Sequence, residues 1–199
     1  MIASVLQAWP DRCHAVPEAR LLLVGGEGKG YGLEAPTGKS HLEDGLAELP
    51  EHVNRSRIHW LGHLAHGDMI KLLQCSACHL GLSYPYTLSW SVLEAMACGA
   101  PLISNHESPI AVECGEASPR SIRLIPFNDA RALSSTIIDL LSNPTERGRL
   151  GAAARCWVER YCSLSRALES YQALFNRLGQ QAVTNQVDLA KSQQNPCHH

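Results

Sequence analysis

The stretch that decides the fold runs from Ser83 to Ser104 and reads SYPYTLSWSVLEAMACGAPLIS. An apolar run ends at its first residue, and Ser89 belongs to the residue types that most often precede a helix. Apolar residues then recur at the spacing of one helix face. Gly99 can end that helix, and the run from Pro101 predicts a further strand. The stretch therefore predicts a strand, a helix and a strand in succession.

Glu94 is the single acidic residue of this stretch, and it lies on the predicted helix. In a sheet of parallel strands, ligands bind beyond the carboxyl ends of the strands, where the N–H groups of a helix's first turn favour phosphate. A carboxylate on that helix can reach such a ligand. The residue types alone leave two roles open, because Glu94 can also be a surface acid that only complements the helix dipole.

Residues 93–101 read LEAMACGAP, which resembles the donor-binding signature of the retaining glycosyltransferases of family 4. The similarity includes LLLVGGEG at residues 21–28 and IHWLGHL at residues 58–64, and it reaches downstream to Leu178. Members of this family have the GT-B fold, and a complete enzyme has two domains of this size. The resemblance therefore implies only the carboxyl-terminal half of that fold, a doubly wound, mostly parallel, Rossmann-like α/β sheet followed by a helical region.

The resemblance also implies a site for a nucleoside diphosphate sugar. In the family, the acid that matches Glu94 accepts hydrogen bonds from the ribose hydroxyls, and the start of its helix meets the diphosphate. The donor-binding residues implied in this way are Gly26, Gly62, His63, Leu64, Tyr86, Thr87, Leu88, Ser89, Trp90 and Glu94. His63 can equally be an exposed loop histidine, and no catalytic residue is identified.

Tyr86 marks a departure from the family pattern. Many members carry a second acid eight positions before the helix Glu, close to the transferred sugar, and this chain has Tyr86 there. Either a subgroup uses the phenol and the backbone in its place, or handling of the sugar is impaired. Tyr86 can also be a hydrophobic plug.

Apolar runs and helical patterns alternate along the whole chain, which predicts a parallel sheet. Strands are predicted at residues 20–24, 57–61, 101–104 and 121–125, with another ending at residue 83. Helices are predicted at residues 2–12, 41–49, 68–75, from 89 onward, and at 129–141, 145–161 and 164–178. Residues 180–199 are polar without a periodic apolar face, which predicts a disordered tail after a donor-binding domain of residues 1–179.

The amino terminus begins inside what the resemblance identifies as the first helix of the domain. The first strand, which is central in the sheet, and its phosphate-binding loop are therefore expected to be missing. Each backbone group left buried and unpaired costs about 1–3 kcal/mol, whereas a whole domain is stable by about 5–15 kcal/mol. We expect the isolated chain to be marginally stable and to require an acceptor domain or a partner chain.

Two glycine-rich segments resemble other nucleotide-binding motifs without matching them. Residues 26–32 read GEGKGYG, in which Tyr31 occupies the place of the third glycine of a dinucleotide fingerprint. The run Gly38-Lys39-Ser40 lacks the glycine that a P-loop needs five positions before Gly38, since Leu33 stands there. The family resemblance makes this segment the rim of the donor cleft, and the alternative is a solvated loop.

Composition and charge exclude several classes of function. The formal net charge is −2, and the 17 Lys and Arg residues are spread along the chain, so nucleic acid is not an expected partner. No apolar segment is long enough to span a membrane. Trp9, Asp11 and Arg12 interrupt what a signal peptide would keep apolar, so we expect a cytoplasmic protein.

The chain has eight cysteines, which we expect to be reduced in the cytoplasm. Cys75, Cys78 and His79 form the C-x-x-C-H pattern of c-type haem attachment. Their context predicts the end of a helix running into a buried strand, and the pair lacks the second half of a zinc site. We therefore predict packing residues and neither haem nor zinc.

The expected activity is transfer of a hexose from a nucleoside diphosphate sugar to an unknown acceptor with retention. The sugar nucleotide is a substrate, and neither cofactor nor metal is expected, because protein donors neutralise the diphosphate in this fold. The alternative is a non-catalytic nucleotide-sugar-binding or interaction module, a remnant or a subunit of a split enzyme. The sequence identifies neither the sugar, the base nor the acceptor.

Overall fold

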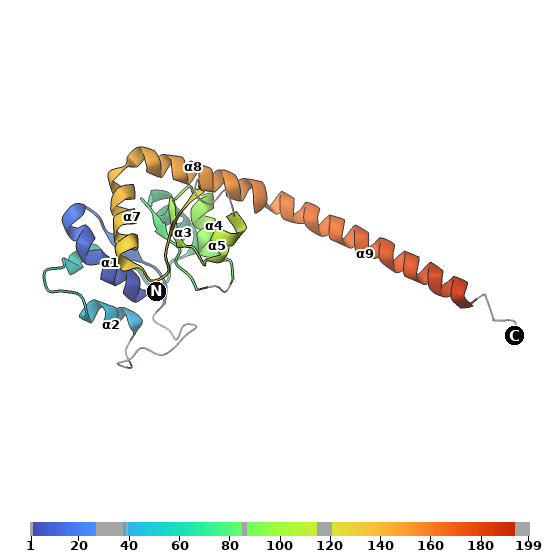
Figure 1. Cartoon of the computed structure of the whole chain (residues 1–199), viewed down its shortest axis with the longest axis horizontal. Helices are drawn as coiled ribbons and strands as arrows, with labels where there is room; N and C mark the ends of the chain where they lie inside the picture. Colours follow the sequence, from blue (N-terminus) through green and yellow to red (C-terminus); the bar gives the residue numbers. More distant parts are fainter. Residues whose placement is uncertain (1, 27–37, 39, 85–86, 115–120, 194–199) are drawn as a thin grey trace. The chain divides into compact units, whose positions relative to one another are not determined.

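Figure 1 shows the computed structural model of the chain, which describes residues 2–26, 38, 40–84, 87–114 and 121–193. The chain divides into two compact units, Met1–Val158 and Glu159–His199. The first contains all the strands of the described residues, and the second is helical.

Helices and strands alternate in the first unit, as the sequence predicts. In chain order its elements are α1 (Ile2–Ala15), β1 (Leu21–Leu23), α2 (His41–Ala47), the 3₁₀ helix η1 (Arg55–Arg57), β2 (Ile58–Trp60), α3 (His66–Cys75), β3 (His79–Leu80), α4 (Trp90–Ala97), β4 (Leu102–Asn105), α5 (Pro109–Cys114), β5 (Ile122–Ile125), α7 (Ala130–Ser142) and α8 (Pro144–Tyr161). The sequence analysis missed η1 and α5, which are short enough to show no periodic apolar face.

All strand pairs are parallel, and this confirms the Rossmann-like α/β class. They form two sheets instead of a single one: β1 pairs with β2, and β4 lies between β3 and β5. Among the described strands, β1 and β3 therefore each pair along one edge only. The two sheets share no strand among the described residues.

Helix α1 joins the cores of the two sheets. On one side Ala8 is buried in a cluster with Ile103 of β4 and Ile125 of β5. On the other side Leu6 and Trp9 are buried in a cluster with β1 and α2. Figure 1 shows α7 beside α1, in agreement with the extensive contact between them. The helix thus has two apolar faces, and each is buried in a different core.

The middle strand of the three-stranded sheet is β4, whose residues Leu102–Asn105 are all buried. Leu102 packs with Val92 and Met96 of α4, so α4 covers this sheet with the apolar face that its sequence predicts. Gly81 allows the close approach, because a Cβ at that position would lie 2.6 Å from the Val92 side chain. Helix α4 is therefore fixed against the strands that precede and follow it.

Helix α9 (Leu164–Gln193) forms most of the second unit. It starts where predicted but does not end at Leu178, and residues 180–193 are helical. No proline lies between Gly179 and Gln193 to stop the helix, and the Ala, Gln, Leu and Lys residues of this segment are good helix formers. The domain boundary at residue 179 stays a prediction.

An exposed apolar row lies along α9, with residues alternately four and three positions apart. Its members are Leu164, Leu168, Tyr171, Phe175 and Leu178. Within the described residues, no helix is both long and apolar enough to cross a membrane. Polar residues cover the rest of the helix surface, so the apolar row does not make α9 a membrane-spanning helix.

Candidate functional site

The loops after β1 and β2 are tied together by hydrogen bonds to backbone carbonyls. The Gly25 N–H donates to the Gly62 carbonyl at 2.9 Å, and the Trp60 Nε1–H donates to the Gly25 carbonyl at 2.9 Å. Gly25 has φ 139° and Gly62 has φ 63°, values that favour glycine. These two glycines let both loops turn at the same edge of the sheet.

Gly26 and His63, two of the candidate site residues, meet at this edge. A Cβ at Gly26 would lie 2.3 Å from His63 Nε2, so the imidazole packs directly on the Gly26 backbone. The His63 side chain is exposed, and Leu64 beside it is half-buried. The structure therefore brings together Gly26, Gly62, His63 and Leu64.

Asn105 organises the loop between β3 and α4, although the sequence analysis did not identify it. This side chain is fully buried at the end of β4. Its Oδ1 accepts a hydrogen bond from the Ser83 N–H at 2.9 Å, and its Nδ2 donates to Glu107 Oε2 at 3.1 Å. A polar residue ending a wholly buried strand was the available signal, because a buried amide needs partners.

Glu107 lies exposed beyond the end of β4. The hydrogen bond from Asn105, aided by a backbone N–H, lowers the pKa of the Glu107 carboxyl. The carboxylate form is the one that Nδ2–H of Asn105 stabilises. Glu107 therefore carries a negative charge at neutral pH. It follows β4, the strand that comes after α4 in the chain.

The start of α4 presents a first turn without a side-chain cap. Ser89 is the N-cap residue with φ −76° and ψ 131°, but its hydroxyl pairs with the Ser91 hydroxyl at 2.9 Å and does not cap the helix. Trp90 is 80% exposed and Thr87 is exposed, whereas Leu88 packs against the core. The first N–H groups of a helix have no intrahelical acceptor, so this end favours an anion. Tyr86 lies outside the described residues.

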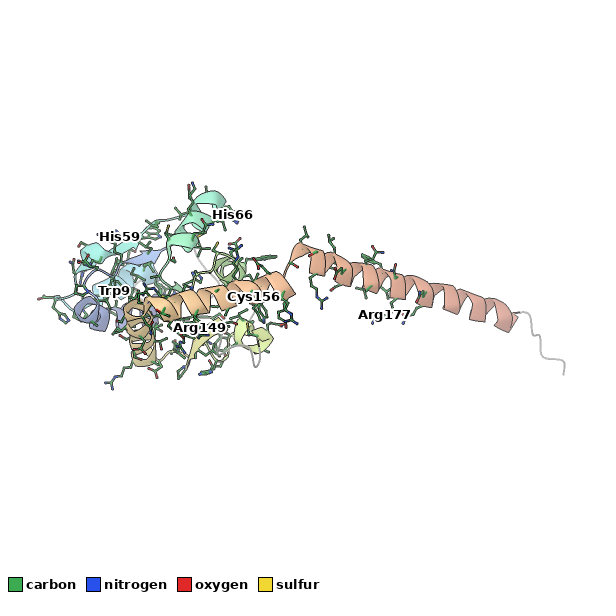
Figure 2. The ribbon with its side chains drawn as sticks, turned by 90° about the horizontal axis from the view of Figure 1, so that it is seen from above. Trp9, His59, His66, Arg149, Cys156 and Arg177 are labelled. Carbon is green, nitrogen blue, oxygen red and sulfur yellow. The ribbon has the colours of Figure 1, made fainter. Side chains whose placement is uncertain are left out.

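Glu94 lies on the second turn of α4, with its side chain 32% exposed. Its Oε1 is 2.9 Å from Nε2 of His66, the first residue of α3, which Figure 2 labels. The sequence analysis did not identify His66, because it belongs to no motif and 28 residues separate it from Glu94. The Glu94 carboxylate is thus partly exposed, and one of its oxygens is hydrogen-bonded to His66.

The packing of α3 on α4 sets this geometry. Leu73 of α3 is buried with Ala95 and Ala100, and the Cys98 Sγ is 4.0 Å from the Ile70 carbonyl. Burial and the nearby Glu94 charge raise the pKa of the Cys98 thiol, with Arg155 opposing them. Cys98 therefore stays a neutral packing group beneath Glu94.

The residues present do not form a metal site within the described ranges. No group of three or more His, Cys, Asp and Glu side chains gathers there in a way that could hold an ion. Cys75 and Cys78 are thiols and not disulfide-bonded, at the end of α3 and just before β3. His79 lies on β3, and burial lowers its pKa.

The model of the family described as Glycosyl transferases group 1 matches residues 2–157. The GDP-mannose-dependent monoacylated alpha-(1-6)-phosphatidylinositol monomannoside mannosyltransferase of Corynebacterium glutamicum is 29% identical over 171 residues, which are 78% of this chain and 38% of that protein. Among solved structures, sucrose-phosphate synthase from Thermosynechococcus elongatus has TM-score 0.70 and 22% identity, over 91% of this chain and 44% of that one. Anabaena HepE in complex with UDP-glucose has TM-score 0.66 and 19% identity, over 87% of this chain and 44% of that one.

The chain spans less than half the length of each of these relatives. The two solved structures share its fold, in which helices flank parallel strands. The family match runs from α1 into α8 and therefore includes α4 with its LEAMACGAP signature. On this match the chain belongs to the family of glycosyl transferases group 1, with a domain of the GT-B type.

Proposed function

We propose that this chain is the donor-binding half of a retaining glycosyltransferase of family 4, which transfers a hexose from a nucleoside diphosphate sugar to an acceptor. The observation that carries the proposal is the position of Glu94. Its carboxylate is accessible on α4, one turn beyond an uncapped helix start. A diphosphate at that start would put the adjoining ribose within reach of the carboxylate.

The chemistry of the two groups suits the two parts of a nucleotide. A carboxylate accepts hydrogen bonds from both hydroxyls of a vicinal diol, at about 1.5–3 kcal/mol for each bond to a charged group. The first turn of α4 adds roughly 0.3–1 kcal/mol for an anion. Gly26 and His63, which meet at the end of β1 and β2, are proposed to lie near the base.

The relatives support a nucleoside diphosphate as ligand but differ in the base. The mannosyltransferase is named for GDP-mannose, and HepE is solved with UDP-glucose. We therefore propose GDP and UDP as the two probes of first choice. Neither cofactor nor metal is proposed, because helix N–H groups and side-chain donors can neutralise the diphosphate. The catalytic residues remain unassigned.

The proposed activity requires an acceptor-binding half or a partner chain. Two features support this requirement. Among the described strands, β1 and β3 each pair along one edge only, so each has a free edge to which a strand of another segment can add. The apolar row of α9 exposes large side chains that another surface can bury.

A non-catalytic nucleotide-sugar-binding or interaction module is the second candidate function, and the free strand edges favour it, because such an edge can pair with another chain. A product assay separates the two candidates. We expect no measurable glycosyl transfer by residues 1–199 alone, whichever sugar nucleotide is supplied. Turnover without any partner would refute the requirement for a second half.

A cytoplasmic location is proposed with either function, in keeping with the thiols.

Calorimetric titration of the full chain with GDP and with UDP tests the donor site. Glu94→Gln keeps the shape of the side chain but removes its charge, and we expect binding to weaken about 10- to 100-fold. Glu113→Gln is the matched control, because Glu113 is an exposed acid on α5. Equal affinity of the original chain and the Glu94→Gln variant would overturn the assignment of Glu94.

A further inference from the structure

His66 and Glu94 form a contact that the proposed donor site does not use. His66 Nε2 lies 2.9 Å from Glu94 Oε1, and among the described residues the structure gives Glu94 Oε2 no hydrogen-bond donor. The two side chains differ in burial, since His66 is 74% exposed and Glu94 is 32% exposed. One carboxylate oxygen is thus held by the protein, and the other is available to a ligand.

The contact is set by rigid elements and not by two mobile side chains. His66 is the first residue of α3, and Glu94 lies in the middle of α4. The two helices pack through Leu73, Ala95 and Ala100, all of which are buried. Because both backbones are fixed, the histidine restricts the rotation of the Glu94 carboxylate.

The position of His66 on α3 adds to this effect. Ala65 is the N-cap residue and makes no side-chain cap, so the start of α3 has unpaired N–H groups near His66. The positive end of a helix favours a nearby carboxylate. Glu94 is therefore in contact with a residue at the positive end of α3.

We propose that His66 is a positioning residue of the nucleotide site, which holds Oε1 of Glu94 so that Oε2 and the remaining lone pair of Oε1 face the ribose diol. This inference rests on the proposed donor function and deepens it. An unheld carboxylate would lose rotational freedom on binding, and that loss weakens binding. His66 removes this loss in advance, as residues behind a binding group commonly do.

The proposal makes the effect of His66 depend on the ribose hydroxyls. GDP has the vicinal diol, whereas 2′,3′-dideoxy-GDP lacks it and cannot bond to either oxygen of Glu94. Removing His66 should therefore weaken the binding of GDP and leave that of the dideoxy compound unchanged. A histidine that only stabilised α3 would affect both ligands alike.

The test is calorimetric titration of the full chain and its variants with both ligands at one pH and ionic strength. We expect His66→Ala to weaken GDP binding roughly 5- to 10-fold, in keeping with loss of one supporting hydrogen bond. His66→Gln places an amide N–H close to the position of Nε2 and should restore most of the affinity. Gln74→Ala, an exposed position on α3, controls for effects on the helix.

A double-mutant cycle completes the test. If His66 acts through Glu94, His66→Ala should change GDP binding little once Glu94 is Gln, so the two losses are not additive. Equal weakening of GDP and dideoxy-GDP, additive losses, or no rescue by Gln would each contradict the positioning role. If Glu94→Gln weakens GDP binding and His66→Ala does not, this inference fails alone. If no nucleotide binds, the proposed function fails, and the inference falls with it.

Discussion

Gly151 of α8 lies against the backbone of Gly99, so closely that a Cβ on Gly151 would come within 2.1 Å of the Gly99 carbonyl oxygen. Gly99 follows α4 with φ 76°, a left-handed conformation that glycine adopts without strain. The turn that ends α4 and the helix α8 thus touch through two glycines. This contact fixes the end of the helix that carries Glu94.

Gly151→Ala should therefore lower the free energy of unfolding by about 1–3 kcal/mol, because α8 must move away from a backbone oxygen. Gly148→Ala is the matched control on the same helix, where an added Cβ meets nothing within 4 Å. It should stabilise the chain by roughly 0.5–1 kcal/mol through helix propensity. Urea unfolding of both variants measures the difference, and equal effects would contradict the close contact.

The sequence predicted most of the alternation of helices and strands, because the residues that start and end a helix act locally. Ser89 and Gly99 bound α4 through helix-start and helix-end preferences, and α8 ends at Tyr161 as predicted. The division into two sheets could not be read in this way, since strand pairing depends on partners far apart in the chain. The predicted end of α9 at Leu178 was wrong, because the segment after Gly179 contains Ala, Gln, Leu and Lys residues that favour a helix.

The same difference between local and long-range signals separates the residues of the candidate site. Glu94 and the glycines Gly26 and Gly62 belong to recognisable motifs, so the sequence alone identifies them as candidate site residues. His66 and Asn105 belong to none, because each acts through a tertiary contact, 28 residues away in the first case and 22 in the second. A single sequence does not show which distant residue such a side chain bonds to.

Asn105→Ala should destabilise the chain by about 1–3 kcal/mol, since the Ser83 N–H would lose its acceptor at a part-buried site. The same change should weaken nucleotide binding, because the loop that leads into α4 would no longer be tied to β4. Glu107→Ala removes only the exposed partner of Asn105 and serves as control, with a change below about 1 kcal/mol. A larger loss of stability in the control than in Asn105→Ala would contradict this role for the amide.

Stability should fall in mild acid because of His79. Burial lowers its pKa in the folded chain, so the unfolded chain binds the proton more readily. The free energy of unfolding should therefore decrease as the pH falls below about 6.5, the ordinary histidine value, toward the lowered pKa. His79→Phe cannot titrate and should show a shallower dependence between pH 7 and 5 in urea unfolding. Identical pH profiles for the two proteins would count against this assignment.

The purified chain should contain neither stoichiometric zinc nor haem. Cys75 and Cys78 have no further His, Cys, Asp or Glu gathered into a ligand set among the described residues. Elemental analysis and an absorption spectrum without a Soret band would check this expectation. One equivalent of zinc, lost together with folding in Cys78→Ser, would contradict it.

A crystal structure of the full chain with GDP or UDP tests the central claim most directly. The account predicts ribose hydroxyls within hydrogen-bond distance of the Glu94 carboxylate, the diphosphate at the first turn of α4, and His66 still bonded to Oε1. A nucleotide bound elsewhere, with Glu94 in contact with His66 alone, would contradict it.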